Sequence, residues 1–251
     1  MIYITGDTHA DWGERFNTSR FPEQKAMTKD DYVIVCGDFG IWTHSKRQEY
    51  WLEWLEHKPF TTLFVSGNHE NYDLLDILPV EEWNGGKINR VRPSIIHLMR
   101  GQTYQIAGKR FFTFGGAQSH DIQEGILRRS DPDFDEKRKT LDKMGRFYRI
   151  EHETWWAREL PSEDEMREGW KNLQKVDNCV DYIITHCPWT SMLLRMRGSN
   201  GTYQPDILTD YLQEIREKVT YRQWYFGHMH ENARFPWENA SCLYEGIWRI
   251  E

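Results

Sequence analysis

The chain of 251 residues is long enough to bury a sizeable core and has the length of one domain or two. Its 12 Trp, 12 Tyr and 12 Phe residues exclude a disordered protein, because disordered chains lack such core formers. The net charge of −7 disfavours a binder of long nucleic acid, which needs a basic surface. No apolar run approaches the roughly 18 residues of a membrane-spanning helix.

The first residues, 1–7, have neither the basic region nor the long apolar stretch of a secretory signal, and they predict a strand. The four cysteines are scattered along the chain and form no C-x-x-C pair. We therefore expect reduced thiols in a cytoplasmic protein, without a disulfide framework or a zinc ribbon. Because no apolar run is long enough to span a membrane, we also expect no membrane partner.

Three short runs of β-branched and aromatic residues end in Gly followed by Asp or Asn, at 2–7, 32–38 and 63–68. Near-continuous apolar runs of this length predict buried strands of a parallel or mixed sheet. Between the second and third runs, apolar residues at helical spacing predict a helix over 45–57. This β-α-β alternation indicates an α/β sandwich or a doubly wound sheet.

Further along the chain, short strands with Gly-rich turns over 94–116 predict an antiparallel hairpin or meander. A charged, proline-interrupted segment follows at about 121–177, in which Ser162 and Glu165 form a capping box that predicts a helix start. The remaining predicted elements are a strand at 181–185, an amphipathic helix over 208–219 and late strands at 223–226 and 241–244. With no internal repeat or Gly/Ser linker, we expect a single domain over 1–251 with a charged insertion or cap.

Polar motifs follow five of the predicted strands. Taken singly, each is compatible with a structural role, such as a hydrogen-bonded core histidine, an Asx turn at Asp38 or a helix cap at Asn68. Because the carboxyl ends of parallel strands gather at one edge of a sheet, where ligands bind, we expect the motifs to form one cluster. Its members are Asp7, His9, Asp38, Asn68, His69, His186, His228 and His230.

This set of oxygen and imidazole donors contains no cysteine, which suits borderline divalent ions. It offers more donors than one ion uses, so we expect two ions about 3.5–4 Å apart that share one carboxylate. We expect Mn, with Fe, Zn, Co or Mg as alternatives. Two dications, two carboxylates and a bridging hydroxide leave a charge of about +1, which attracts a phosphate anion to an acidic chain.

In this order, Asp7-x-His9, Gly37-Asp38, Gly67-Asn68-His69-Glu70, His186 and Gly227-His228-x-His230 resemble the motifs of the calcineurin-like metallophosphoesterases, from residue 1 to about residue 231. The insertion looks like that of small bacterial members. The resemblance implies a four-layer α/β/β/α sandwich of two mixed sheets with a dimetal site at the C-terminal edge of the strands.

The resemblance also implies a role for each motif residue. The first metal would be held by Asp7, His9 and His230, and the second by Asn68, His186 and His228. Asp38 would bridge the two ions, and His69 would be the general acid beside the leaving oxygen. Glu70 has two open roles, either orienting a neighbour or placing charge in the first turn of the following helix.

The chemistry implied is phosphoester hydrolysis by a metal-bridging hydroxide, with an imidazole of pKa about 6.5 protonating the departing alkoxide. We expect a phosphodiesterase acting on a small nucleotide or other diester. The alternatives are a phosphomonoesterase and a catalytically silent binding scaffold, and the scaffold is disfavoured because none of the seven ligand positions is missing.

One departure from the resemblance bears on the substrate. Protein phosphatases and dinucleoside-polyphosphate hydrolases of the family continue the Gly-Asp motif with a further Asp and an Arg, where this chain has Ile41 and Trp42. Without that arginine clamp for a dianion, a diester is favoured, and Trp42 becomes a candidate contact for its second arm. His120 and Asp121 are further candidate substrate contacts. Candidate phosphate clamps, with a solvated charged face as the alternative, are Arg128, Arg129, Arg138 and Arg146.

Overall fold

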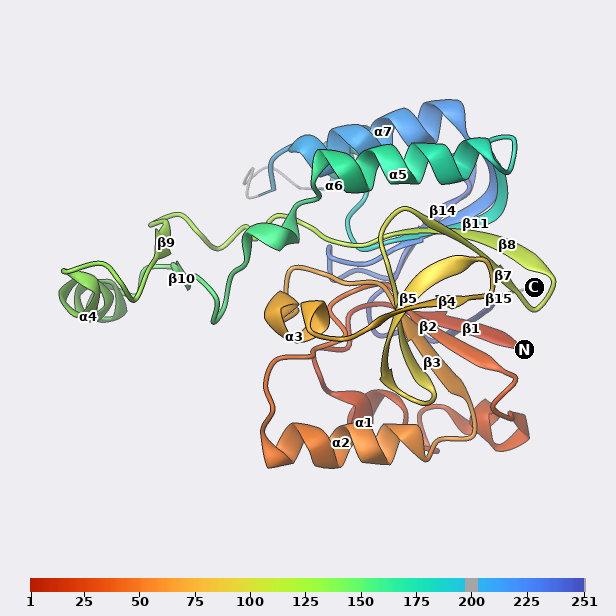
Figure 1. The fold of residues 1–251 in the computed structure, drawn as a ribbon, viewed down its shortest axis with the longest axis horizontal. Helices are drawn as coiled ribbons and strands as arrows, with labels where there is room; N and C mark the ends of the chain where they lie inside the picture. The colour runs from red at the N-terminus through yellow and green to blue at the C-terminus, as the bar shows by residue number, and fades with distance from the viewer. Residues whose placement is uncertain (197–202, 251) are drawn as a thin grey trace.

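The computed structural model describes residues 1–196 and 203–250, in which two mixed sheets lie face to face with helices on their outer faces (Figure 1). The first sheet has seven strands, in the order β15 (Trp248–Ile250), β1 (Ile2–Thr5), β2 (Tyr32–Val35), β3 (Thr61–Phe64), β6 (Ile95–Leu98), β5 (Gly86–Arg92) and β4 (Val80–Trp83). Its β1, β2, β3 and β6 run parallel, and the outer strands pair antiparallel.

The second sheet repeats this plan with six strands. Their order is β13 (Ala233–Phe235), β14 (Ala240–Cys242), β12 (Thr220–Phe226), β11 (Cys179–Thr185), β8 (Lys109–Phe114) and β7 (Gln102–Ile106). The four central strands β14, β12, β11 and β8 are parallel, and an antiparallel strand closes each edge. Each sheet therefore collects the carboxyl ends of several parallel strands at one edge.

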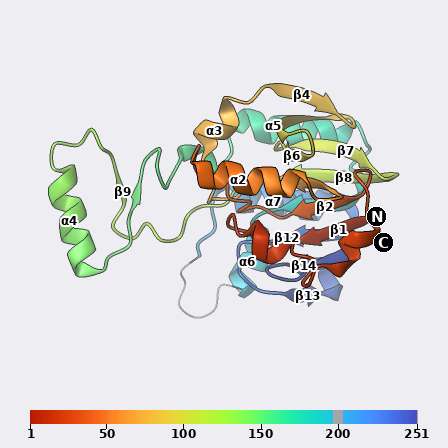
Figure 2. The ribbon, with the colours of Figure 1, turned by 90° about the horizontal axis from the view of Figure 1, so that it is seen from below.

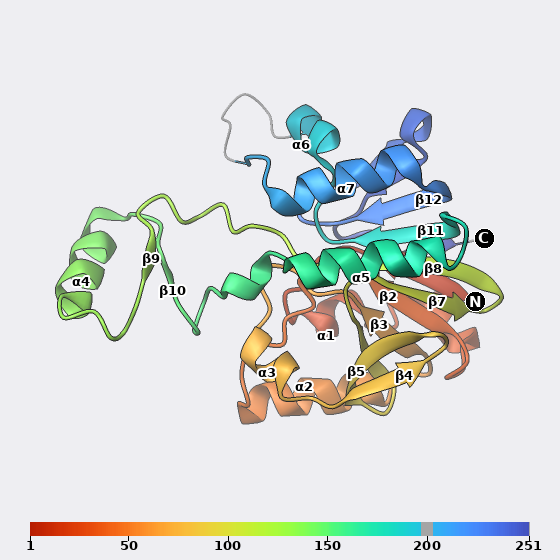
Figure 3. The ribbon, with the colours of Figure 1, turned by 45° about the horizontal axis from the view of Figure 1, so that its top comes forward.

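Alternation of side chains along the strands divides the core into three layers. In β1, Ile2 and Ile4 pack between the sheets, whereas Tyr3 points to the helix side. The first sheet is covered on that side by α1 (Trp12–Arg15) and α2 (Lys46–Glu56). The outer face of the second sheet carries α5 (Glu163–Gln174), α6 (Thr190–Met196) and α7 (Ile207–Lys218), as Figure 3 shows. The expected four-layer sandwich is confirmed.

Local signals start the helices where the sequence predicts them. The side chain of Ser45 accepts a hydrogen bond from the Gln48 backbone and begins α2, and the predicted capping box of Ser162 and Glu165 begins α5. The remaining short helical elements are α3 (Tyr72–Asp76) and 3-10 turns at Pro22–Ala26, Ala157–Glu159 and Pro236–Glu238. No helix in residues 1–196 and 203–250 is long and apolar enough to cross a membrane.

The expectation of one antiparallel hairpin or meander over 94–116 is wrong in part. Strand β6 joins the first sheet, parallel to β3, and only β7 and β8 form an antiparallel hairpin, which belongs to the second sheet. The chain crosses between the sheets at Arg100 and Gly101. All four residues of β6 are buried, so no alternation in the sequence marks which neighbour it pairs with.

Residues 121–156, named the arm below, leave the sandwich on the side where β1 ends (Figures 1 and 2). The arm contains a short parallel pair, β9 (Ile126–Leu127) and β10 (Arg149–Ile150), and the helix α4 (Phe134–Met144). By contrast, α5 lies over the second sheet, where Leu173 is buried in the core. The projecting part is therefore shorter than the charged segment of 121–177.

Candidate metal centre

The loops after β1, β2, β3, β11 and β12 meet at one edge of the sandwich and bring all eight predicted cluster residues together. The backbone N–H groups of Thr8 and His9 both donate to the Asp38 carbonyl, at 3.1 and 2.7 Å. The two sheets are joined by His228, whose backbone N–H donates to Asp7 Oδ1 at 3.0 Å. These bonds fix the loops that carry the side chains.

The donor atoms form two groups that could each hold a metal ion. In the first, Asp7, His9 and His230 offer atoms within 4.8 Å of one another, and His230 Nε2 lies 3.2 Å from both Asp7 Oδ2 and His9 Nε2. The second is formed by Asp7, Asp38 and His186. Asp38 faces both groups, because Oδ1 lies 3.3 Å from His186 Nε2 and Oδ2 lies 3.8 Å from His9 Nδ1.

His186 tests whether this donor set suits a cation. Its Nδ1 lies 2.8 Å from the Cys36 carbonyl, and a proton on Nδ1 leaves the Nε2 lone pair facing Asp38 Oδ1 and Asn68 Oδ1, the latter at 3.2 Å. Three electron-rich atoms thus converge on one buried point. Burial opposes a charged imidazole, but the carboxylates of Asp38 and Asp7 outweigh it and raise the pKa of His186 to about 9. The arrangement calls for a positive charge and fits a metal ion.

Glycines let the loops approach this closely. A Cβ on Gly67 would lie 2.0 Å from Asp38 Oδ1, and a Cβ on Gly227 would lie 2.2 Å from Asp7 Oδ1. The backbone also curls sharply at several candidate ligands. Positive φ angles of 47°, 46°, 65° and 51° occur at His9, Asp38, His228 and His230.

Glu70 holds the loop that follows Asp38. Its fully buried carboxylate accepts backbone N–H groups from Phe39, Gly40 and Ile41, at 2.6, 3.1 and 2.9 Å. The cap of α3 is Asn71, whose side chain accepts from the Leu74 backbone. Of its two open roles, Glu70 therefore has the first, because it orients the loop around Asp38.

His69 is fixed on two sides. Its backbone N–H donates to Asp38 Oδ1 at 2.8 Å, and its carbonyl accepts from the indole of Trp42 at 2.7 Å. Trp42 is 41% exposed and borders the site. Burial lowers the pKa of His69, and the guanidinium of Arg149 adds to this effect against the opposing charge of Asp38.

Sequence reasoning missed Arg149. Its Nη2 donates to His69 Nε2 at 3.2 Å, and its Nε and Nη2 bind the two carboxylate oxygens of Asp121, each at 2.8 Å. Asp121, a predicted substrate contact, is thus engaged by an arginine. Nothing in the local sequence distinguishes Arg149 from the other arm arginines. Three of the predicted clamps form exposed ion pairs within the arm, Arg128–Glu151, Arg129–Glu153 and Arg146–Glu124.

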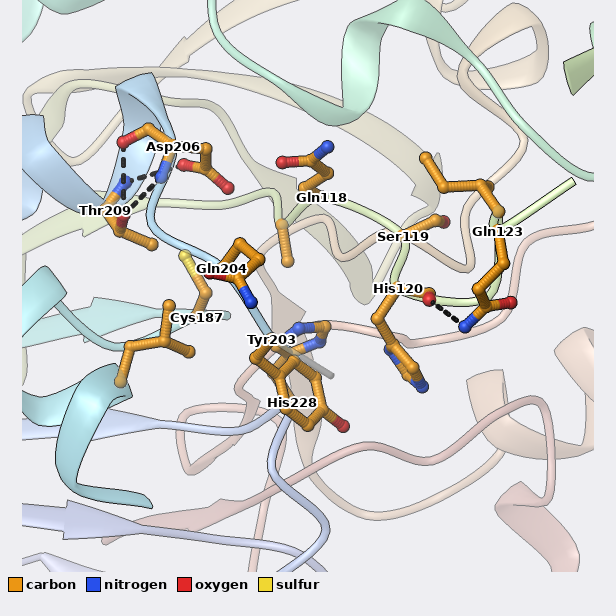
Figure 4. A pocket seen from close by; sticks show the side chains of 13 residues that line it. Gln118, Ser119, His120, Gln123, Cys187, Tyr203, Gln204, Asp206, Thr209 and His228 are labelled. Carbon is orange, nitrogen blue, oxygen red and sulfur yellow. Dashed lines mark hydrogen bonds between the residues drawn. The ribbon is translucent and has the colours of Figure 1, made fainter. Parts of the chain in front are cut away.

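Two cavities adjoin the site. One of about 440 Å³ is bordered by His228, by the predicted contact His120 and by Tyr203, with ring centroids of the last two 4.6 Å apart (Figure 4). No Lys or Arg lies among its described lining residues. The other, of about 560 Å³, is bordered by His9 and Trp42. Each cavity therefore touches a different candidate ligand of the centre, and both have the size of small-ligand sites.

Comparison with known proteins gives a family match and distant relatives. Residues 1–232 match the family model described as calcineurin-like phosphoesterase. The chain is similar to lariat debranching enzyme A of Xenopus laevis, with 26% identity over 51% of this chain and 26% of the relative. It is also similar to the lariat debranching enzyme of Caenorhabditis briggsae, with 26% identity over 74% of this chain and 35% of the relative. The chain thus spans between a quarter and about a third of these relatives' length.

Among solved structures, the crystal structure of phosphopantetheinyl hydrolase from Mycobacterium tuberculosis aligns with a TM-score of 0.44 and 13% identity. The alignment covers 97% of this chain and 87% of that chain.

Proposed function

The chain belongs to the calcineurin-like phosphoesterase family, and from this premise we propose that it is a phosphodiesterase that uses two divalent metal ions. Its substrate is a small nucleotide or another diester. The first ion is held by Asp7, His9 and His230, the second by Asn68, His186 and His228, and Asp38 is shared. The two oxygens of Asp38 support this sharing, because one faces His186 and the other faces His9.

Such ions, when bound, polarise phosphoryl oxygens and make a water molecule acidic enough to attack at neutral pH. The protein's own side chains orient the candidate ligands and supply a proton. His186 is oriented by the Cys36 carbonyl and lies against Asn68 Oδ1. Glu70 holds the Asp38 loop in place. His69, whose backbone is anchored by Asp38 and Trp42, supplies a proton to the departing ester oxygen.

The preference for a diester is supported by the two cavities. A phosphodiester has two organic arms, and each cavity adjoins a different part of the centre, one at His228 and one at His9. The absence of Lys and Arg among the described residues that line the first cavity suits an uncharged arm better than a second phosphate. Trp42, exposed at the second cavity, offers an indole face to an apolar or base-bearing arm.

The test compares bis(4-nitrophenyl) phosphate with 4-nitrophenyl phosphate, which share a leaving group and differ in the second arm. With the protein saturated with Mn, kcat/KM is expected to be higher for the diester, and a chelator should abolish both reactions. A preference of about tenfold or more for the monoester would overturn the proposal in favour of a phosphomonoesterase.

A variant sharpens the same comparison. Trp42→Arg adds a guanidinium to the cavity beside His9, which Arg47 also lines, so it should favour the monoester dianion and narrow the difference in kcat/KM between the two substrates. Tyr50→Arg is the matched control, because Tyr50 is exposed on α2 and lines neither of the two cavities. An equal change in both variants would show that net charge, not position, sets the preference.

A further inference from the structure

We propose that Arg149, delivered by the arm, is a substrate-binding residue that donates hydrogen bonds to the non-bridging oxygens of the bound phosphoester. This inference rests on the proposed function and deepens it: a diester also presents two non-bridging oxygens, which share one negative charge, so a single arginine at this place is compatible with a diester substrate. It concerns a residue of the segment farthest from the sandwich, joined to the centre by its contact with His69 at 3.2 Å. It also gives the arm a task, which is to add a fixed positive charge to a site built mainly of carboxylates and imidazoles.

The guanidinium of Arg149 is held in place by hydrogen bonds to neighbouring groups. Asp121 binds Nε and Nη2 at 2.8 Å, the Thr154 carbonyl accepts from Nη1 at 3.0 Å, and the side chain is only 12% exposed. A guanidinium has five N–H donors in one plane, and its Nη2 carries two of them. In this structure Nη2 contacts both Asp121 Oδ2, at 2.8 Å, and His69 Nε2, at 3.2 Å, so one of its N–H groups is directed at the site.

The present acceptor is a weak one for such a donor. Because a guanidinium only donates, His69 Nε2 acts here as a neutral acceptor. An anionic phosphoryl oxygen is a stronger partner, because both groups of an arginine–phosphate pair are charged and the two N–H donors of the fork match the phosphate oxygens. A phosphoester bound between His69 and the two candidate metal groups therefore draws the Nη2 donor from the imidazole to the phosphoryl oxygen.

Hydrogen bonds connect the arm to α3, which directly follows the loop that carries His69. These bonds hold Arg149 in position to contact His69. Asp73 of α3 accepts from His152 Nδ1 at 3.0 Å and from the indole of Trp156 at 2.8 Å. Arg158, just after the arm, bonds Asp76 of the same helix at 2.6 Å. These bonds set the distance between the arm and the loop that ends at α3.

The experiment measures inorganic phosphate binding to the Mn-loaded protein by calorimetry, together with kcat and KM for bis(4-nitrophenyl) phosphate. Arg149→Ala should weaken phosphate binding and lower kcat/KM by about 10–100-fold each, the usual effect of a lost hydrogen bond between charged groups. Arg149→Lys should give values between those of the wild type and Arg149→Ala, because lysine keeps the positive charge but cannot donate two parallel hydrogen bonds. Millimolar guanidinium in solution should partly restore the phosphate binding and the kcat/KM of the Arg149→Ala protein.

Lys137→Ala is the matched control, since this arm cation is 53% exposed and pairs with Asp133 on the arm. Its phosphate affinity and its kcat/KM should equal those of the wild type. Wild-type phosphate affinity in correctly folded Arg149→Ala and Arg149→Gln proteins, or the same loss in Lys137→Ala, would overturn the assignment. If the wild type hydrolyses no phosphoester, the proposed function fails, yet phosphate calorimetry still decides the role of Arg149.

Discussion

The loops at the strand ends and the arm hold their ionisable side chains by different means. In the loops, Asp7 and Asp38 are almost fully buried, are fixed by backbone N–H groups and lie within one rigid edge of two sheets. In the arm, the ion pairs of Arg128 and Arg146 are exposed, whereas the contacts of Arg149 with Asp121 and His69 are partly buried. Burial makes the loops preorganised, whereas the arm is positioned by a few polar contacts at its base. Substitutions in the loops should therefore act on the whole centre, and substitutions near the arm on narrower properties.

The largest effect is expected from Asp38→Asn. One side chain faces both donor groups, so its loss should lower bound metal and activity together. The fall in metal affinity should exceed the roughly 10–100-fold typical of a residue one step removed from the ion. Elemental analysis checks this, with the exposed Asp30→Asn as control, and two full equivalents of metal in an active Asp38→Asn protein would remove Asp38 as the shared ligand.

His69→Ala separates acid catalysis from metal binding. Turnover should fall by about 10²–10⁴-fold for a diester with an alkyl leaving group, which departs only with a proton. The loss should be much smaller for 4-nitrophenolate, and metal content should stay near that of the wild type. Equal losses on both substrates, or loss of metal, would make His69 a ligand instead.

At the base of the arm the expected effect is on stability and not on activity. Glu159 is buried, its carboxylate accepts from the Ser119 backbone at 3.0 Å, and burial raises its pKa from 4.5 to about 8. Between these values the folded chain holds a proton that the unfolded chain has released. Stability should therefore fall as pH rises through this window, by at most about 1.4 kcal/mol per pH unit.

Urea unfolding of the chelator-treated protein between these pH values measures this slope. Glu159→Gln, which stays neutral, should make this slope shallower, and the remaining slope should come in part from Glu70, whose pKa burial also raises to about 8. Glu53→Gln should leave the slope unchanged because Glu53 is largely exposed on α2. A slope that is the same in Glu159→Gln as in the wild type would assign it to other groups.

The sandwich and the cluster could be predicted because their signals are local. Each of Asp7, Asp38 and Asn68 follows a short apolar run, and parallel strands must end at a common edge. The edge hairpin of β4 and β5 was not predicted, because Val80–Trp83 is partly exposed and carries two glutamates, so it lacks an apolar run.

Arg149 could not be predicted from sequence for a different reason. Its contact with His69 spans 80 positions and depends on how the arm docks on α3. The arm holds several arginines of similar surroundings in sequence, and only the fold separates Arg149 from Arg128. The role of Glu70 was likewise undecided, because its three backbone partners lie about 30 residues earlier in the chain.

The sharp backbone turns at the candidate ligands have a thermodynamic consequence. A non-glycine residue in the left-handed region costs roughly 1–2 kcal/mol, and His9, Asp38, His228 and His230 all lie there. Their sum is a sizeable share of the roughly 5–15 kcal/mol by which a folded protein exceeds its unfolded state. The loops are thus kept at the expense of stability, and a descendant released from selection for function would gain stability by replacing these residues with glycine or asparagine first.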